Sequence, residues 1–469
     1  MLENAAGDWA LDLYRRANLP DVRLTARLVR LATVAARNPG GRILDVYKTS
    51  ADRQGAYDFL ENPRVSVDRI AECAFGASVR GTADFPYAFV VVDGASLTLT
   101  DRGGRKGFGS VGTSHRPATG LHLINAYAVE PDGTPIGVVG QVWWSRRASK
   151  RRQDHKLRDV SERETQRWLD TVAGVSTLFE EFAPKTRAWF VVDREGDSSS
   201  MLKSLDESGH FFTVRSNADR IIESSTGRST LQRKLNRQRT RYCFDLQVAP
   251  GLNRTGRVAR MAVRACSVTL RPQRPAQPRV RMELNCVEIR EVGARPRGEK
   301  PLHWRLLTNV DIETHEGLRA IVRSYSCRWR IEELHRTWKS GACRIEDSQL
   351  RSVDALKKWA TLMITVAARI ERLKIRSRTE PAVLADVELT KYEIEALIIL
   401  KRKYKKKTET IPDEMPTLAQ AVLWLAEIGG YTGKSSGGPP GSITIRRGYD
   451  DIIQAAALLE ALEKAGRLR

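Results

Sequence analysis

The segment between Tyr325 and Lys339 carries four polar residues at a spacing suited to phosphate chemistry. Tyr325, Arg328, Glu332 and Lys339 stand at positions i, i+3, i+7 and i+14 of a stretch without Pro or Gly, which predicts one continuous helix capped by Gly341. At about 100° per residue, all four fall within a sector of about 60°. A carboxylate between phosphate-binding groups is what a metal-dependent phosphoryl-transfer site requires. An ordinary solvated helix with i,i+4 pairs shows the same pattern, so the interpretation depends on partner carboxylates.

Two such carboxylates follow apolar runs upstream. Residues 88–93 and 187–193 predict short strands that end in Asp93 and Asp193. Two-metal phosphoryl transfer needs at least three carboxylates around ions about 3.5–4 Å apart, and strand ends faced by the helix of Glu332 could supply them. Each acid alone is a common loop residue, whereas the set favours a metal site. The sequence has no CxxC or HxxxH spacing, so oxygen ligands and therefore Mg²⁺ or Mn²⁺ are expected.

The composition indicates a polyanionic partner. The chain has 469 residues, of which 41% are hydrophobic, and 78 Lys and Arg against 56 Asp and Glu give a net charge of +22. This excess favours nucleic acid, with a basic ribosome-associated or membrane-surface protein as the alternative. Two or three structural units are expected at this length. The six scattered cysteines support neither a disulfide framework nor a zinc site.

Membrane and nucleotide binding are not expected. No signal-peptide core and no apolar run of about 18 residues is present, which predicts a soluble intracellular protein. The Gly-Lys-Ser at 433–435 lacks the upstream glycine spacing and the preceding strand of a P-loop, so a nucleotide cofactor is rejected.

The first 75 residues are predicted to be helical and basic. Residues 22–37 place a stripe of Leu and Ala on one face, interrupted by Arg23, Arg27, Arg30 and Arg37. This pattern indicates either a small helical DNA-binding unit or a solvated basic face, and the net charge favours the former. A second short helix is expected at 51–63.

The middle of the chain predicts an α/β fold. A strand meander is followed by alternating helices and strands, which is the element order of a ribonuclease-H-like core. The expected elements are strands at 88–93, 121–130 and 135–144, a helix at 161–182, a strand at 187–193, a helix at 199–205 and a strand at 210–216. An all-β insertion is expected at about 217–300, a returning strand at 302–309 and a long helix at 352–375.

The C-terminal part is predicted to be helical. Helices are expected at 417–428 and 450–464, the second of which could pair with a partner subunit or, more in line with its amphipathic pattern, pack within the chain. The basic run 401–407 is either a phosphate-contacting patch or a disordered linker.

Several unlinked motifs in the right order resemble one family. The Tyr-x2-Arg-x3-Glu-x6-Lys spacing of 325–339, with V-D-G-A-S-L at 92–97 and V-D-R-E-G-D at 192–197, is similar to the DDE transposases of bacterial cut-and-paste elements in the insertion-sequence-four group. The motifs Q-G-A-Y-D-F-L-E-N-P, F-T-V-R-S and P-L-H-W-R-L-L-T match as well. The resemblance covers most of residues 20–350 and fades in the insertion and after about residue 375.

The resemblance implies a role for each matching residue. Asp93, Asp193 and Glu332 would be the metal-binding triad, with Mg²⁺ as cofactor and Mn²⁺ as substitute. The phosphate-binding groups would be Tyr325, Arg328, Lys339 and Arg215, and Trp304 would accept a flipped base during hairpin formation. Arg23, Arg27 and Arg30 lie where the family's N-terminal helices contact the transposon end. Asp197 and Glu195 could compete as ligands, although an ion pair or a capping role is expected for them.

The whole prediction is a cut-and-paste DNA transposase. It comprises a helical DNA-binding region at 1–75, a ribonuclease-H-like core at 76–375 and a helical, dimerising region at 376–469. The resemblance implies nicking of double-stranded transposon ends, hairpin formation and opening, and joining to target DNA, by a homodimer in the bacterial cytoplasm at the nucleoid. The alternatives are a metal-dependent nuclease of the same fold and an inert DNA-binding relic of a transposase.

Overall fold

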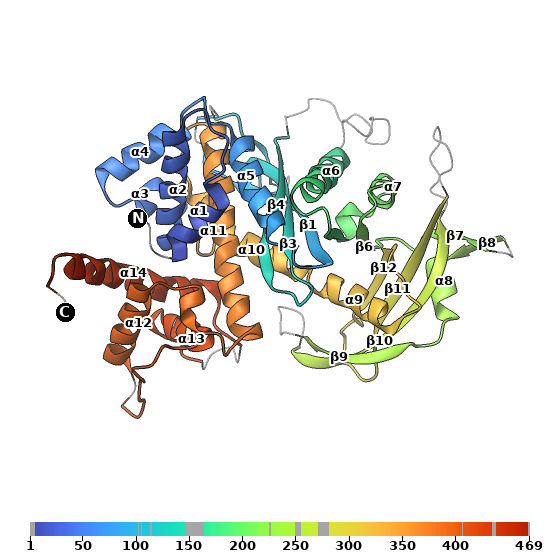
Figure 1. Ribbon diagram of the computed structural model, residues 1–469. Coiled ribbons are helices and arrows are strands. Elements are labelled where there is room, and N and C mark those ends of the chain that lie inside the picture. Colours follow the sequence, from blue (N-terminus) through green and yellow to red (C-terminus); the bar gives the residue numbers. More distant parts are fainter. Residues whose placement is uncertain are drawn as a thin grey trace.

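The computed structural model describes residues 5–101, 103–104, 106–112, 115–146, 164–224, 227–248, 255–270, 281–405, 407–433 and 438–467. A mixed sheet forms the middle of the molecule, with the N-terminal and C-terminal helices together at one end and the strands of the predicted insertion at the other (Figure 1). The long helix α11 (Val353–Thr379) runs between the two groups of terminal helices (Figure 1). In the described part of the chain, no helix is both long and apolar enough to cross a membrane.

One continuous sheet contains every strand of the described residues. Its strands lie in the spatial order β2 (Gly109–Ser110), β3 (Thr119–Val129), β1 (Tyr87–Thr98), β5 (Arg187–Val192), β6 (Phe211–Arg215), β12 (His303–Thr308), β11 (Met282–Val292), β10 (Arg257–Leu270), β7 (Ile221–Ser224) and β8 (Gly227–Thr230). Two further strands lie off this path: β4 (Pro135–Trp144) pairs with β3, and β9 (Tyr242–Val248) pairs with β10. The strands β1, β5 and β6 are parallel, and the remaining pairs are antiparallel.

The predicted meander is confirmed. Antiparallel β1–β3 and β3–β4 pairs follow one another, and the turn between β3 and β4 contains Gly133 at φ +97°, a conformation that favours glycine. The helices α6 (Thr165–Phe182) and α7 (Ser199–Glu207) then alternate with β5 and β6 as expected. The start predicted for α6, at residues 161–163, lies outside the described residues.

The region 217–300 differs from the predicted all-β insertion in two respects. It contains a helix, α8 (Leu231–Asn236), whose first turn is capped by the side chain of Thr230. Its strands are also not a separate unit, because β11 pairs with β12, and β12 pairs with β6. The insertion therefore extends the core sheet. Most of the Pro- and Gly-rich separators at 250–256 and 271–278 lie outside the described residues.

Alternation along the strands gives the sheet two buried faces. Residues such as Val91 and Val191 pack on the face covered by α9 (His315–Ser326), α10 (Trp329–Lys339) and α11. Their neighbours Val92 and Val192 point to the other face, which α6 and α7 cover. Because strand side chains alternate with a period of two, each sheet position has a fixed face.

The N-terminal helices pack on α11 and on the edge of the sheet. They are α1 (Ala5–Tyr14), α2 (Val22–Arg37), α3 (Ile43–Val46), α4 (Ser50–Leu60) and α5 (Val67–Arg80). The predicted bounds of α2 are confirmed, and the buried Leu28, Leu31 and Ala35 form its inner stripe. The ammonium group of Lys358 on α11, fully buried, donates to the carbonyls of Leu60 and Asn62. These two hydrogen bonds connect the N-terminal helices to α11.

The C-terminal helices form a core of their own. They are α12 (Lys391–Tyr404), α13 (Leu418–Ile428) and α14 (Ser442–Lys464), so α14 begins earlier than the predicted residue 450. It packs on α12 and α13 within the chain. The first residues of the run 401–407 end α12, where the buried Lys401 forms ion pairs with Glu409 and Glu427, while Lys403 and Lys405 are exposed. A phosphate-contacting role for the exposed residues of this run stays a prediction.

Candidate active site

Asp93 and Asp193 lie at matching positions on neighbouring parallel strands. The last register pair of β1 and β5 is Val92–Val192, so Asp93 is the next residue of β1 and Asp193 directly follows the end of β5. Both continue the alternation of Val91 and Val191 and therefore point to the face covered by α10. Asp93 is not at a strand end as predicted, because β1 continues to pair with β3 as far as Thr98. It marks the point at which β1 loses β5 as its neighbour.

The two aspartates interact electrostatically. Burial and then the negative charge of Asp193 raise the pKa of Asp93 to about 7, although nearby Arg328 and the Gly94 N–H group lower it. The Gly94 N–H donates to Asp93 Oδ1 at 2.9 Å, and the Glu195 N–H donates to Asp193 Oδ1 at 2.7 Å. Like charges held together in this way favour a bound proton or a cation.

The predicted helix over 325–339 is two helices. Tyr325 lies in the last turn of α9, and α10 begins at Trp329. At the break, the Arg328 N–H donates to the carbonyl of Tyr325, only three residues back, at 3.2 Å. Because this is a 3₁₀-type bond, the regular i→i−4 ladder stops there and the predicted common face is interrupted. At the other end, the Gly341 N–H donates to the Arg336 carbonyl at 2.8 Å, which fits its predicted capping role.

The carboxylate of Glu332 forms an ion pair with Arg328, one helical turn before it. Arg328 Nη2 lies 2.5 Å from Glu332 Oε1, and Arg328 is only 7% exposed. Burial works against its charge, but the bond to Glu332 and the nearby Asp93 carboxylate hold the pKa of Arg328 above its ordinary value. Arg328 thus interacts with both acids.

Asp93, Asp193 and Glu332 carry the type of ligand that a hard divalent cation prefers, but the three carboxylates do not together form a metal-binding site. Carboxylate oxygens are the ligands that Mg²⁺ and Mn²⁺ prefer, and the repulsion between Asp93 and Asp193 would be relieved by a cation. However, the described residues contain no group of three or more His, Cys, Asp or Glu side chains that could hold a metal ion. The pair Asp93–Asp193 is brought together, whereas Glu332 is bound to Arg328.

Three of the predicted DNA-binding residues form a cluster on the same face. Arg215, at the end of β6, donates to the hydroxyl of Tyr325 at 3.2 Å and to the carbonyl of His303 at 3.1 Å. The rings of Trp304 on β12 and Tyr325 have centroids 5.3 Å apart. Burial raises the pKa of Tyr325, whose hydroxyl is therefore a neutral group beside the guanidinium. The cluster lies at the edge where β1 and β5 present their aspartates, because β12 runs antiparallel to β6.

Lys339 is placed at the far end of α10. Its ammonium lies 3.7 Å from the carboxylate of Glu346, which accepts from the backbone N–H of Thr98 at 2.8 Å. This residue is therefore near the end of β1, beyond Asp93, and has an acidic partner of its own.

The N-terminal arginines are exposed on α2, away from the aspartates. Arg23 pairs with Asp21 and Arg30 with Asp52, and the guanidinium of Arg27 lies against Gly55 of α4. Figure 1 places α2 and α4 at the end of the molecule opposite the extended sheet. The structure does not bring them to the carboxylates.

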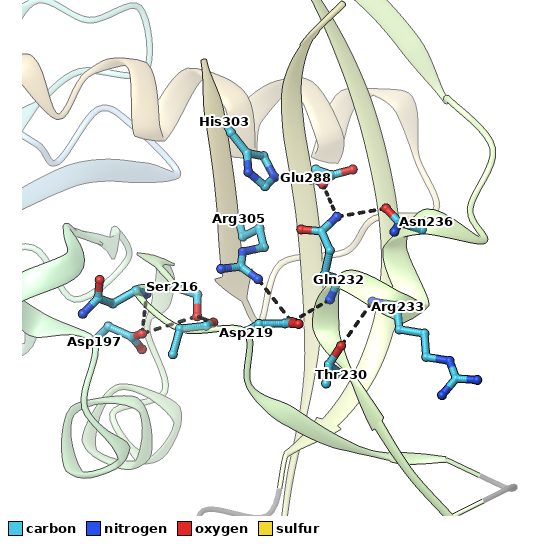
Figure 2. Close-up of polar contacts among 12 residues, drawn as sticks. Asp197, Ser216, Asp219, Thr230, Gln232, Arg233, Asn236, Glu288, His303 and Arg305 are labelled. Atoms are coloured by element: carbon cyan, nitrogen blue, oxygen red, sulfur yellow. Dashed lines mark hydrogen bonds and ion pairs between the residues drawn. The ribbon is translucent and has the colours of Figure 1, made fainter. Parts of the chain in front are cut away.

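A polar network not predicted from the sequence joins α8 to the strands β11 and β12 (Figure 2). Gln232 on α8 donates to Glu288 of β11 at 2.7 Å, and Glu288 also binds the ring of His303, whose carbonyl accepts from Arg215. Glu288 is buried, and these two partners lie on separate elements, α8 and β12. No short sequence pattern marks these residues, because their contacts are made across strands.

Asp197 is a structural residue rather than a competing ligand. It accepts from Arg220 at 2.5 Å and from the backbone N–H of Asn217 at 2.7 Å, and Ser216 lies beside it (Figure 2). The ion-pair role expected for Asp197 is confirmed.

Two family models match the chain. Residues 6–65 match the model described as transposase DNA-binding, and residues 169–368 match the model described as transposase DDE domain. The first segment contains the exposed arginines of α2. The second contains Asp193, Glu332 and the cluster around Tyr325, while Asp93 lies before it.

These matches show a DNA transposase of the DDE class, and the mixed α/β fold is compatible with it. The chain carries a transposase DNA-binding domain followed by a DDE domain, and it is an enzyme that acts on DNA. Enzymes with DDE domains generally use divalent metal ions.

Proposed function

We propose that this DDE transposase moves its element by a cut-and-paste reaction. Water attacks the phosphodiester at a transposon end and releases a 3′-hydroxyl, which then attacks the opposite strand to give a hairpin. Hydrolysis opens the hairpin, and the 3′-hydroxyl finally attacks a phosphodiester of target DNA. The observation that carries this proposal is the shared register of Asp93 and Asp193, one residue after the Val92–Val192 pair, on the face that α9 and α10 cover.

Asp93, Asp193 and Glu332 are the residues proposed to hold the divalent metal, with Mg²⁺ as the ion and Mn²⁺ as a substitute. When bound, such ions activate the attacking oxygen and stabilise the leaving oxygen. Glu332 Oε1 accepts from Arg328, which leaves Oε2 for a cation, and a DNA phosphate is a further suitable partner for that guanidinium.

Arg215, Tyr325 and Arg328 are proposed to bind the phosphates around the scissile bond. Their guanidinium and hydroxyl groups already lie together on the metal-binding face. Lys339 is proposed to contact DNA further along α10. Trp304, in contact with the ring of Tyr325, is proposed to stack on a base that leaves the duplex during hairpin formation.

The finer classification is also a proposal. The core belongs to the ribonuclease-H-like folds, and the protein belongs to the insertion-sequence-four group, with the transposase of transposon five as a similar member. Arg23, Arg27 and Arg30 bind the terminal repeats, and residues 376–469 mediate a dimer that brings two ends together. The enzyme acts at the bacterial nucleoid.

The experiment that tests the proposed function is a product analysis. The full-length protein is incubated with its own element's end DNA, target plasmid and Mg²⁺, and the products are resolved on a denaturing gel. Nicked, hairpin and joined products are expected in that order. Nicked products alone would indicate a nuclease without strand transfer, and complexes without any cleavage would indicate a DNA-binding relic.

A further inference from the structure

A chain of buried polar side chains lies between the sheet and α10. Asn125 of β3 is hydrogen-bonded to His335 of α10 at 3.0 Å and to Gln141 of β4 at 3.0 Å. Gln141 in turn accepts from Thr361 of α11 at 2.7 Å. Asn125 and Thr361 are fully buried, and His335 is 8% exposed. The hairpin of β3 and β4 and the two helices α10 and α11, which are distant from it in sequence, therefore meet through one network.

The direction of every bond in this network follows from one indole. Trp143 Nε1 can only donate, and it lies 2.9 Å from Gln141 Oε1. The amide nitrogen of Gln141 must then donate to Asn125 Oδ1, which leaves Asn125 Nδ2 to donate to His335 Nε2. His335 Nε2 therefore carries no proton, and the imidazole is neutral. In agreement, burial lowers the pKa of His335 to about 3.

The network meets the candidate active site at two places. Asn125 is the register partner of Asp93, so the two side chains stand opposite each other on one face, with Cβ atoms typically about 4.5–5.5 Å apart. His335 follows Glu332 by three residues, and residues at this spacing are neighbours on a helix. The Asn125–His335 bond thus joins the strand of one acid to the helix of the other.

Apart from this bond, α10 contacts the hairpin of β3 and β4 through Arg330, which donates to the carbonyl of Gly133 at 3.0 Å, and it packs on the sheet through apolar side chains. Ile331, Leu334 and Trp338 of α10 are fully buried in the core on this face. Apolar burial is not directional, so it permits small shifts and rotations of the helix at little cost. A hydrogen bond between desolvated groups does not permit such shifts, because a displaced Asn125 would lose its partner in the core.

We propose that Asn125 and His335 are positioning residues of the carboxylate site: their hydrogen bond fixes α10 on the sheet so that Glu332 can reach the ion bound by Asp93 and Asp193. Gln141 and Thr361 hold Asn125 in the required orientation. The inference rests on the proposed metal site, and it assigns a role to residues that bind neither metal nor DNA.

The test measures metal affinity and cleavage separately. The full-length protein in complex with its end DNA is titrated with MnCl₂, and the free Mn²⁺ is followed by electron paramagnetic resonance. His335→Phe removes the acceptor but keeps a ring of similar size. It is expected to weaken Mn²⁺ binding and slow single-turnover cleavage by about 10- to 100-fold, the range seen when residues behind metal ligands are changed, with end-DNA affinity unchanged. His335→Gln, whose amide oxygen can accept from Asn125, is expected to restore both to within about threefold.

Tyr14→Phe is the matched control. It removes a buried hydrogen bond of the same length, between Tyr14 and Thr365, far from the carboxylates. It is expected to lower the melting temperature with no change in Mn²⁺ affinity. If His335→Phe behaves in the same way as this control, the positioning role is overturned. If His335→Phe does not fold, Asn125→Ser tests the same bond from the sheet side, with the same two outcomes.

A further variant separates this inference from the proposed function. Asp93→Asn should abolish tight Mn²⁺ binding. If it binds Mn²⁺ as the wild type does, the proposed carboxylate site is itself wrong, and the positioning role fails with it. If Asp93→Asn loses the metal but His335→Phe does not, only the positioning role is overturned.

Discussion

The guanidinium of Arg328 lies 2.5 Å from the carboxylate of Glu332, so the third acid of the site is paired with the cation that precedes its own helix. The same guanidinium interacts with Asp93. In the protein without DNA, a positive charge thus stands between the two acids.

Removal of the positive charge of Arg328 should strengthen cation binding by the DNA-free protein. Arg328→Gln is expected to increase the affinity of the DNA-free protein for Mn²⁺ by about 3- to 10-fold, because a like charge near the ion is lost. Cleavage of end DNA should nevertheless fall, since the phosphate loses a charged partner. Isothermal titration and a cleavage assay measure the two effects. Weaker Mn²⁺ binding by the variant would show that Arg328 does not compete with the metal.

Neutralisation of any proposed metal ligand should stop the chemistry. Asp93→Asn, Asp193→Asn and Glu332→Gln are each expected to reduce cleavage with Mg²⁺ by at least about 10³-fold, because each removes a carboxylate that two-metal catalysis needs. Filter binding should show end-DNA affinity within a few-fold of the wild type. Glu195→Gln is the control, since Glu195 lies near Asp93 but is not a proposed ligand. Normal cleavage by any of the first three variants would remove that residue from the site.

Loss of the Trp304 ring should separate nicking from hairpin formation. Trp304→Ala is expected to form the nick at nearly the wild-type rate but to accumulate it, with hairpin yield reduced about tenfold or more, because base stacking on an aromatic ring contributes about 1–3 kcal/mol. Trp304→Phe keeps a ring beside Tyr325 and should recover part of the yield. A product ratio unaffected by Trp304→Ala would leave Trp304 as a core residue.

The neutral His335 should make the protein sensitive to acid. Its pKa is lowered to about 3 in the folded state, so below its ordinary pKa of about 6.5 the unfolded chain takes up a proton that the folded chain does not. The contribution of the neutral His335 to the free energy of unfolding is complete above about pH 6.5 and is lost as the pH falls towards 3. Between pH 7 and pH 5 the free energy of unfolding should fall by about 2 kcal/mol. Urea unfolding of the wild type and His335→Gln at both pH values measures the difference. Equal slopes with pH would show that His335 is protonated in the folded protein.

Binding of end DNA should depend steeply on salt. If several phosphates are neutralised, affinity is expected to fall about 10³-fold or more between 50 and 200 mM NaCl. Arg27→Ala and Arg30→Ala should each reduce the slope of log K against log salt by about 1 if the residue contacts a phosphate. Lys203→Ala, on the exposed side of α7 and paired with Glu207, serves as the control. An unchanged slope in both α2 variants would place the DNA contact elsewhere.

The sequence alone predicted the strands that carry the acids. Two apolar runs that end in Asp can be recognised without a structure. The spacing of Tyr325, Arg328, Glu332 and Lys339 indicated a DDE transposase, and the two matched domains agree with that class. These features depend on local periodicity and on residue type, both of which can be recognised in short segments of the sequence.

Only the tertiary structure decided how the acids are held. The break before Arg328 and the extension of the core sheet by the insertion were not expected from periodicity. The bond from Arg328 to Glu332 is an i,i+4 pair, which the sequence offered only as an alternative. The Asn125–His335 bond joins residues 210 positions apart. A buried asparagine and a helix histidine have no distinguishing local pattern, because their partner is set by packing between elements. The sequence therefore determined which groups can do the chemistry, and the packing of α10 on the sheet determined whether they can meet.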